Sequence, residues 1–154
     1  MLLGGKIAGL VINILCLILL VGTVIYLIVA WGSLPDQIPG HFGGDGQITR
    51  YGSKGTLIIP LVIAWLLYLG FLVIERVPQI WNTGVRVTEE NKYRVYGTIR
   101  SLLSTVKLII CAVFAFITII ASQSQNLPSW FLGVFIQFLL VTLIIHIFWL
   151  FKVR

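Results

Sequence analysis

The stretch Ile7–Trp31, IAGLVINILCLILLVGTVIYLIVAW, decides the fold, because it is 25 residues long and carries no charge. A transmembrane helix needs about 20 predominantly apolar residues. Lipid offers no hydrogen-bond partners to the backbone, so such a stretch crosses a membrane only as a helix. Its apolar core is far longer than the roughly 7–15 residues of a cleavable signal peptide. We therefore interpret it as a retained membrane span.

Three further segments are similarly apolar, at residues 56–74, 101–121 and 130–151, and only the second of them carries a charge, Lys107. Across the whole chain 58% of the residues are hydrophobic and only 10% are charged, whereas a soluble domain carries roughly 25% charge. The composition excludes a soluble surface and implies contact with the lipid bilayer. We predict an all-α membrane protein, in which residues 1–154 form one four-helix transmembrane bundle.

The basic residues predict the orientation of the chain in the membrane. The N-terminal segment, the loop at residues 75–100 and the C-terminal tail together hold eight Lys and Arg residues, whereas the loop at residues 32–55 holds two. Basic loops stay in the cytoplasm. We therefore expect both termini in the cytoplasm, a location in the cell membrane, and loop 32–55 outside. The basic residues are too scattered to indicate nucleic-acid binding.

The outer loop is rich in residues that form turns. Pro35 and Pro39 keep the chain extended, and Asp45-Gly46 is a strong turn pair. A connection of more than about 15 residues is usually functional or disordered, and the apolar residues in this one argue against disorder. We expect an ordered extracytoplasmic lid on the bundle, in which a short hairpin is one arrangement.

The lid also holds the candidate binding residues, and three interpretations of them are open. In the first, Asp36, His41 and Asp45 only hold the lid in shape. In the second, these three side chains bind a metal ion. In the third, His41 and Phe42 contact a ligand, while Arg50 and Lys54 meet lipid headgroups or an acidic group. The spacing matches no known ligand signature. We therefore assign no catalytic residue, metal ligand or cofactor, and an enzyme is the less favoured class.

Four polar side chains lie within the predicted spans: Asn13, Lys107, Gln137 and His146. An ionisable group inside a membrane is by default a functional-site hypothesis. Lys107 either snorkels to the cytoplasmic interface or pairs inside the bundle. Asn13 and Gln137 are expected to bond between helices. His146 makes one interhelical bond or relays protons. Convergence of all four would indicate a small transporter.

The segment Thr88-Glu89-Glu90-Asn91 predicts the start of a helix. A threonine hydroxyl accepts a free backbone N–H, and acidic side chains meet the positive end of the helix dipole. We expect one helix from about Glu89 to Ala121, which projects out of the membrane. Its basic stem, residues 88–100, either faces lipid headgroups or docks a cytoplasmic regulator.

The motif Leu34-Pro-x-x-Ile-Pro-x-His-Phe42, followed by glycines and Ser53-Lys54, resembles the N-terminal membrane domain of the SdpI family. That family is named for an immunity protein against a bacterial toxin. Residues 82–108 are also similar to the family's run into its third span. The resemblance implies a multi-pass bacterial membrane protein whose lid binds a peptide toxin or envelope component, for immunity or sensing. The alternatives are a small transporter and, third, a surface metal-dependent enzyme.

Overall fold

The computed structural model describes residues 2–153, with side chains described from residue 7. All four helices are long and apolar enough to cross a membrane, which confirms the predicted four-helix transmembrane bundle. The side chain of Lys6 and the whole of Arg154, both used to predict the orientation, lie outside the described part. The elements in chain order are α1 (Leu2–Ala30), β1 (Gln37–Phe42), β2 (Ile48–Ser53), α2 (Ile58–Arg76), α3 (Lys92–Ser122) and α4 (Phe131–Lys152).

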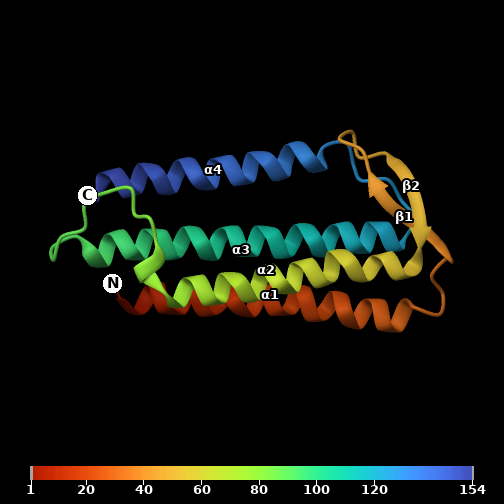
Figure 1. Ribbon diagram of the computed structural model, residues 1–154, viewed down its shortest axis with the longest axis horizontal. Helices are drawn as coiled ribbons and strands as arrows, with labels where there is room; N and C mark the ends of the chain where they lie inside the picture. Colours follow the sequence, from red (N-terminus) through yellow and green to blue (C-terminus); the bar gives the residue numbers. More distant parts are fainter. Residues whose placement is uncertain (1, 154) are drawn as a thin grey trace.

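Helix α3 is the centre of the bundle. It packs against α1, α2 and α4. Figure 1 shows α1 and α2 along one flank of α3 and α4 along the other. The two strands lie at one end of the bundle, whereas the start of α1, the end of α4 and the connection between α2 and α3 lie at the opposite end (Figure 1). The long helices therefore separate the lid from the connection between α2 and α3.

Apolar side chains hold α1, α2 and α3 together midway along their length. The buried members of this central cluster are Cys16, Leu20, Ala64, Tyr68 and Cys111. Both cysteines are free thiols. By contrast, the outward faces of the helices expose many large apolar side chains. Contiguous exposed apolar surface marks contact with lipid or protein, and here it lies on α1, α2 and α4.

The outer loop is a β-hairpin docked on the bundle. β1 pairs with β2 in antiparallel fashion, and irregularities in the register lie on both sides of His41. Ile38 of β1 is 0% exposed. It packs with Leu27 of α1, with Leu57 directly before α2, and with Ala121 of α3. Full burial of an isoleucine side chain contributes roughly 1.5–3 kcal/mol. The loop is therefore ordered, as predicted, and a short hairpin is the form it takes.

The turn of the hairpin is tied to the connection between α3 and α4. The N–H of Leu127 donates to the carbonyl of Gly46 at 2.9 Å. Asn126 accepts from the N–H of Ile48 at 2.9 Å and donates to the side chain of Gln47 at 2.8 Å. Gly46 has φ +82°, and a Cβ there would lie 2.5 Å from the carbonyl oxygen of Leu127. Only glycine fits this contact, so the lid is fastened at its turn as well as at β1.

Two helix boundaries differ from the expected ones. α2 continues through Glu75 and Arg76, which the sequence placed in the following loop. α3 begins at Lys92 rather than at Glu89, and residues 89–91 form a turn before it, in which Thr88 and Asn91 bond to each other. The side-chain oxygen of Asn91 accepts from the N–H of Thr88 at 2.7 Å, and the N–H of Asn91 donates to the Thr88 hydroxyl at 3.3 Å. The first difference brings the carboxylate of Glu75 into the bundle.

We expect the substitution Gly46→Ala to loosen the lid. The new Cβ would meet the carbonyl of Leu127, and the left-handed backbone conformation costs roughly 1–2 kcal/mol for a residue other than glycine. Hydrogen exchange of the lid amides should therefore accelerate by about 5- to 30-fold. Gly44→Ala is the control, because a Cβ at Gly44 meets nothing within 4 Å. Equal exchange rates in the two variants would show that the turn is not docked.

Candidate functional site

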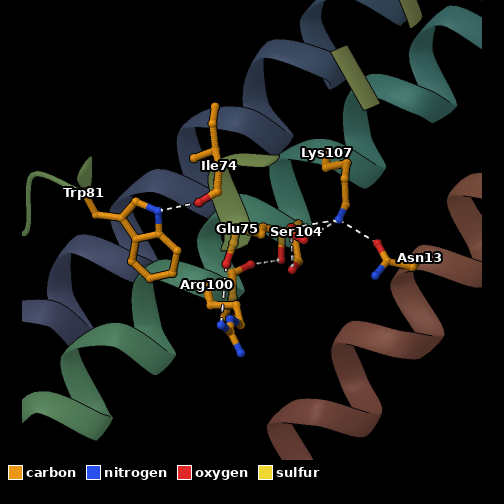
Figure 2. A network of polar contacts seen from close by, with 9 residues as sticks. Asn13, Ile74, Glu75, Trp81, Arg100, Ser104 and Lys107 are labelled. Carbon is orange, nitrogen blue, oxygen red and sulfur yellow. Dashed lines mark hydrogen bonds and ion pairs between the residues drawn. The ribbon is translucent and has the colours of Figure 1, made fainter. Parts of the chain in front are cut away.

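A buried ion pair joins α2 to α3 inside the bundle (Figure 2). Nζ of Lys107 lies 2.8 Å from each carboxylate oxygen of Glu75. The side chains of Lys107 and Glu75 are only 1% and 11% exposed. The hydroxyl of Ser104 donates to the same carboxylate at 3.0 Å. The structure therefore agrees with the second interpretation of Lys107, in which its ammonium group is paired inside the bundle.

Asn13 brings α1 into the same network. Its side-chain oxygen accepts from Nζ of Lys107 at 2.6 Å. Figure 2 shows the end of the Lys107 side chain between Asn13 and Glu75. Nζ also lies 5.9 Å from the ring centroid of Tyr68. A charged group in the membrane interior is costly unless it is paired. The partners from α1 and α2 are what allow Lys107 to be buried.

Two side chains from outside α2 bind backbone carbonyl groups in the last turn of that helix. Nε1 of Trp81 donates to the carbonyl of Ile74 at 2.8 Å, and a guanidinium nitrogen of Arg100 lies 3.5 Å from the carbonyl oxygen of Glu75 (Figure 2). Carbonyls in the last turn of a helix lack a full set of partners within the helix. Trp81 also packs edge-on against Tyr96 of α3, with ring centroids 5.9 Å apart. The connection between α2 and α3 is therefore fastened to the bundle next to the ion pair.

Gln137 and His146 lie apart from this network. Nδ1 of His146 lies 2.7 Å from the carbonyl oxygen of Thr142, and Nε2 lies 3.2 Å from the hydroxyl of Ser101. A neutral imidazole satisfies both contacts by donating from Nδ1 and accepting at Nε2. Gln137 is exposed on α4, on a face that no described helix covers, so it does not make the interhelical bond expected of it. The four polar side chains do not converge, and the condition for a transporter is not met.

In the lid, four of the candidate residues hold its shape. Asp45 accepts the N–H of Gln47 at 3.0 Å and so closes the turn. Asp36 pairs with Lys54 at 3.6 Å, and the N–H of Lys54 donates to the carbonyl of Asp36 at 3.2 Å. An exposed ion pair of this kind contributes little to stability. Phe42 is partly buried against the cluster beneath β1.

The other two candidates, His41 and Arg50, face each other across the strand register. Both side chains are exposed. Nδ1 of His41 lies 2.6 Å from the hydroxyl of Thr49, which leaves Nε2 without a partner in the described part of the chain. The guanidinium of Arg50 likewise has no ion pair among residues 7–153. Tyr51, next to Arg50, is 55% exposed. The hairpin thus presents uncommitted polar groups, and the next residue of β2 carries an exposed aromatic ring.

The candidate metal ligands of the lid do not come together in one site. Over residues 2–153 no group of three or more His, Cys, Asp and Glu side chains lies close enough to hold a metal ion. Asp36, His41 and Asp45 contact Lys54, Thr49 and Gln47 respectively. A zinc enzyme needs three protein ligands around one open position. The arrangement therefore does not favour a surface metal-dependent enzyme.

Several residues of these sites were not predicted from the sequence, among them Glu75, Ser104 and Asn126. Glu75 directly follows an apolar run and reads as the first residue of a loop. One signal does exist for it. Spans two and three are joined by a single connection, so the end of one and the start of the other lie on the same side of the membrane. A carboxylate at the end of span two can therefore reach a lysine about two turns into span three.

Comparison with known proteins finds a family match that covers the lid. The family described as "Domain of unknown function (DUF1648)" matches residues 18–64. An uncharacterized protein of Archaeoglobus fulgidus is 33% identical over 66 residues, which cover 38% of this chain and 36% of that protein. The chain therefore spans about a third of the length of this relative. No solved structure matches. The comparisons support a multi-pass membrane protein of unknown function, and the SdpI-type resemblance stays a prediction.

We expect the two amide side chains in the spans to respond differently to substitution. Asn13→Leu removes a hydrogen bond to the buried ammonium of Lys107 and should lower the free energy of unfolding by about 1–2 kcal/mol. Gln137→Leu is the matched control, and it should leave stability unchanged or raise it because this side chain is exposed on α4. Reversible unfolding in mixed micelles measures both. A larger loss for Gln137→Leu than for Asn13→Leu would contradict the network.

Proposed function

We propose that this chain is a binding protein of the cell membrane, with both termini in the cytoplasm. Its outer hairpin recognises an acidic group on an extracytoplasmic peptide or envelope component. The observation that carries the proposal is the pair of exposed side chains His41 and Arg50, which have free donor and acceptor groups on a hairpin that is fastened at both β1 and its turn. A guanidinium pairs bidentately with a carboxylate or phosphate, and a site that is already ordered loses less entropy on binding.

The hairpin also favours a ligand of extended shape. β1 is the inner strand, with Ile38 and Pro39 buried, whereas β2 is mostly exposed. The sheet has two strands within the described residues, so no third strand covers the outer edge of β2. An extended peptide adds to such an edge through main-chain hydrogen bonds, and its side chains provide specificity. Arg50 and Tyr51 of β2 would then contact the peptide side chains.

The resemblance to SdpI-type proteins supports a site in the lid, because it rests largely on the same loop. Toxin immunity and envelope sensing are two uses of such a site, and the ligand decides between them. Sensing would also require a partner in the cytoplasm, for which the basic stem at residues 88–100 is the candidate surface. The matched relatives carry no assigned function. The family match covers the lid, and neither relative names a ligand.

The polar network in the bundle supports a structural role more than transport. The ammonium of Lys107 is occupied by Glu75 and Asn13, and the carboxylate of Glu75 is shared with Ser104. The groove between α3 and α4 is lined by apolar and aromatic side chains, among them Phe116. Substrate pathways through membrane proteins use ionisable residues that face a water-filled cavity. The groove does not have that character.

The proposal predicts selective binding of acidic peptides from outside the cell. The probes are a short fluorescent peptide of alternating Glu and Val and its counterpart with Lys in place of Glu, each added to intact cells that express the protein. The acidic peptide should bind in preference. Arg50→Ala should weaken its binding by about tenfold or more, because a hydrogen bond to a charged group contributes roughly 1.5–3 kcal/mol. His41→Ala should weaken it less.

Arg76→Ala is the matched control, since Arg76 is also an exposed arginine but lies at the opposite end of α2. It should leave peptide binding unchanged. Equal binding of the Lys peptide would overturn the proposed charge preference. An equal loss of peptide binding in Arg50→Ala and Arg76→Ala would show that the lid is not the recognition site. Binding only after the cells are permeabilised would show that the lid does not face outward.

A further inference from the structure

A polar pocket of about 520 Å³ lies at the end of the bundle opposite the lid. The connection between α2 and α3 and the first turn of α3 form it, at the same end as the start of α1 and the end of α4 (Figure 1). It shares no residue with the lid or with the Lys107 network. Its lining consists of Gly84, Val85, Arg86, Thr88, Glu90, Asn91 and Arg94.

Hydrogen bonds between side chains and backbone hold the wall of this pocket in shape. Asn91 is 5% exposed. Its amide nitrogen donates to the carbonyl of Arg86 at 3.0 Å, and its oxygen accepts from the N–H of Thr88 at 2.7 Å. The N–H of Gly84 donates to the side chain of Asn82 at 3.1 Å, and Gly84 has φ +64°. The backbone that carries Arg86 is thus fixed against the helix that carries Arg94.

The two arginines in the pocket have no acidic partner. The ion pairs of the described chain join Lys54 to Asp36, Lys92 to Glu89 and Lys107 to Glu75, and neither Arg86 nor Arg94 takes part in one. This concentration of unpaired guanidinium groups is a site for an anion, because a guanidinium matches the geometry of phosphate or carboxylate.

Two further groups in the lining adjust the charge and the hydrogen bonding. The oxygen of the Thr88 hydroxyl accepts the N–H of Asn91 at 3.3 Å, so the hydroxyl hydrogen is available to a ligand. Glu90 is the one carboxylate of the lining. The positive end of the α3 dipole lies beside it. The pocket therefore keeps a net positive charge and a neutral donor.

The length of α3 sets the depth of the pocket in the bilayer. α3 has 31 residues, which span about 46 Å at 1.5 Å per residue. The hydrocarbon core is about 30 Å thick, so roughly 16 Å of the helix lies outside it. One end of α3 lies beneath the hairpin, where Ala121 joins the cluster below β1. Near the other end, Trp81 packs against Tyr96, and such aromatic residues gather at the membrane interface. The pocket therefore lies at the level of the headgroups.

We propose that this pocket binds the phosphate ester of an anionic phospholipid, of which phosphatidylglycerol is the representative. The guanidinium groups of Arg86 and Arg94 pair with the phosphate oxygens, and the hydroxyl of Thr88 donates to the same group. The carboxylate of Glu90 repels the bound anion and so limits the affinity. Anionic lipid in the cytoplasmic leaflet attracts basic segments at the membrane surface. Binding here is independent of any ligand at the lid.

Native mass spectrometry of the purified full chain in detergent tests the proposal, with phosphatidylglycerol as the probe and phosphatidylcholine as the comparison. The wild-type protein should retain phosphatidylglycerol in preference. The double variant Arg86→Gln/Arg94→Gln should lose affinity for it by about tenfold or more. The control pair Arg76→Gln/Lys152→Gln removes the same charge from exposed residues outside the pocket and should keep the wild-type affinity. Glu90→Gln should bind more tightly, a gain that misfolding cannot produce.

Three results would overturn the proposal. The first is wild-type affinity in Arg86→Gln/Arg94→Gln. The second is an equal loss in the control pair, which would make the effect one of net charge. The third is competition by glycerol 3-phosphate at the same concentration as the lipid, which would assign the pocket to a soluble phosphate ester. Failure of the peptide experiment at the lid would leave this proposal unaffected, because the two sites share no residue.

Discussion

The ammonium group of Lys107 is buried within the membrane, and the positions of three helices depend on its being paired. α1 contributes Asn13 and α2 contributes Glu75. An unpaired buried charge costs several kcal/mol, and hydrogen bonds tolerate only a few tenths of an ångström in length. The contacts of Lys107 with Asn13 and Glu75 therefore fix the positions of α1 and α2 along α3. α4 gives Lys107 no partner and is attached to α3 by other contacts, such as the stacking of Phe131 on Phe116 at 4.8 Å.

Because α1 and α3 are held in register, their ends beneath the hairpin form a fixed platform for it. The hydroxyls of Tyr26 and Ser122 meet there at 3.0 Å, and Ile38 fills the space beside Ala121. Polar groups are thus of two kinds in this molecule. Those inside the bundle are satisfied by one another. Arg50 on the hairpin and Arg86 in the connection before α3 have no acidic partner among the described residues, and this is why both ligand proposals concern the ends of the bundle.

The sequence predicts the parts of this structure that depend on one segment at a time. Four spans follow from the length of the apolar runs, and the hairpin turn follows from Asp45-Gly46. The contacts between segments are different. Asn13 and Gln137 are both single amides in apolar runs, yet one bonds to Lys107 and the other is exposed. The rotation of each helix about its axis decides which side chains face a neighbour, and no described helix covers the face of α4 that carries Gln137. The contact of Asn126 with the hairpin likewise depends on where a second loop crosses the first.

The claim that the Lys107–Glu75 pair holds the bundle together is tested most directly by a double-mutant cycle. Unfolding free energies in mixed micelles would be compared for Glu75→Gln, Lys107→Met and the double variant. Each single substitution should destabilise the protein, Glu75→Gln by about 3–5 kcal/mol because it leaves a buried ammonium unpaired. The double variant should be more stable than Glu75→Gln, with a coupling energy of roughly 1–3 kcal/mol. Additive effects, with no coupling, would show that the pair does not position the helices.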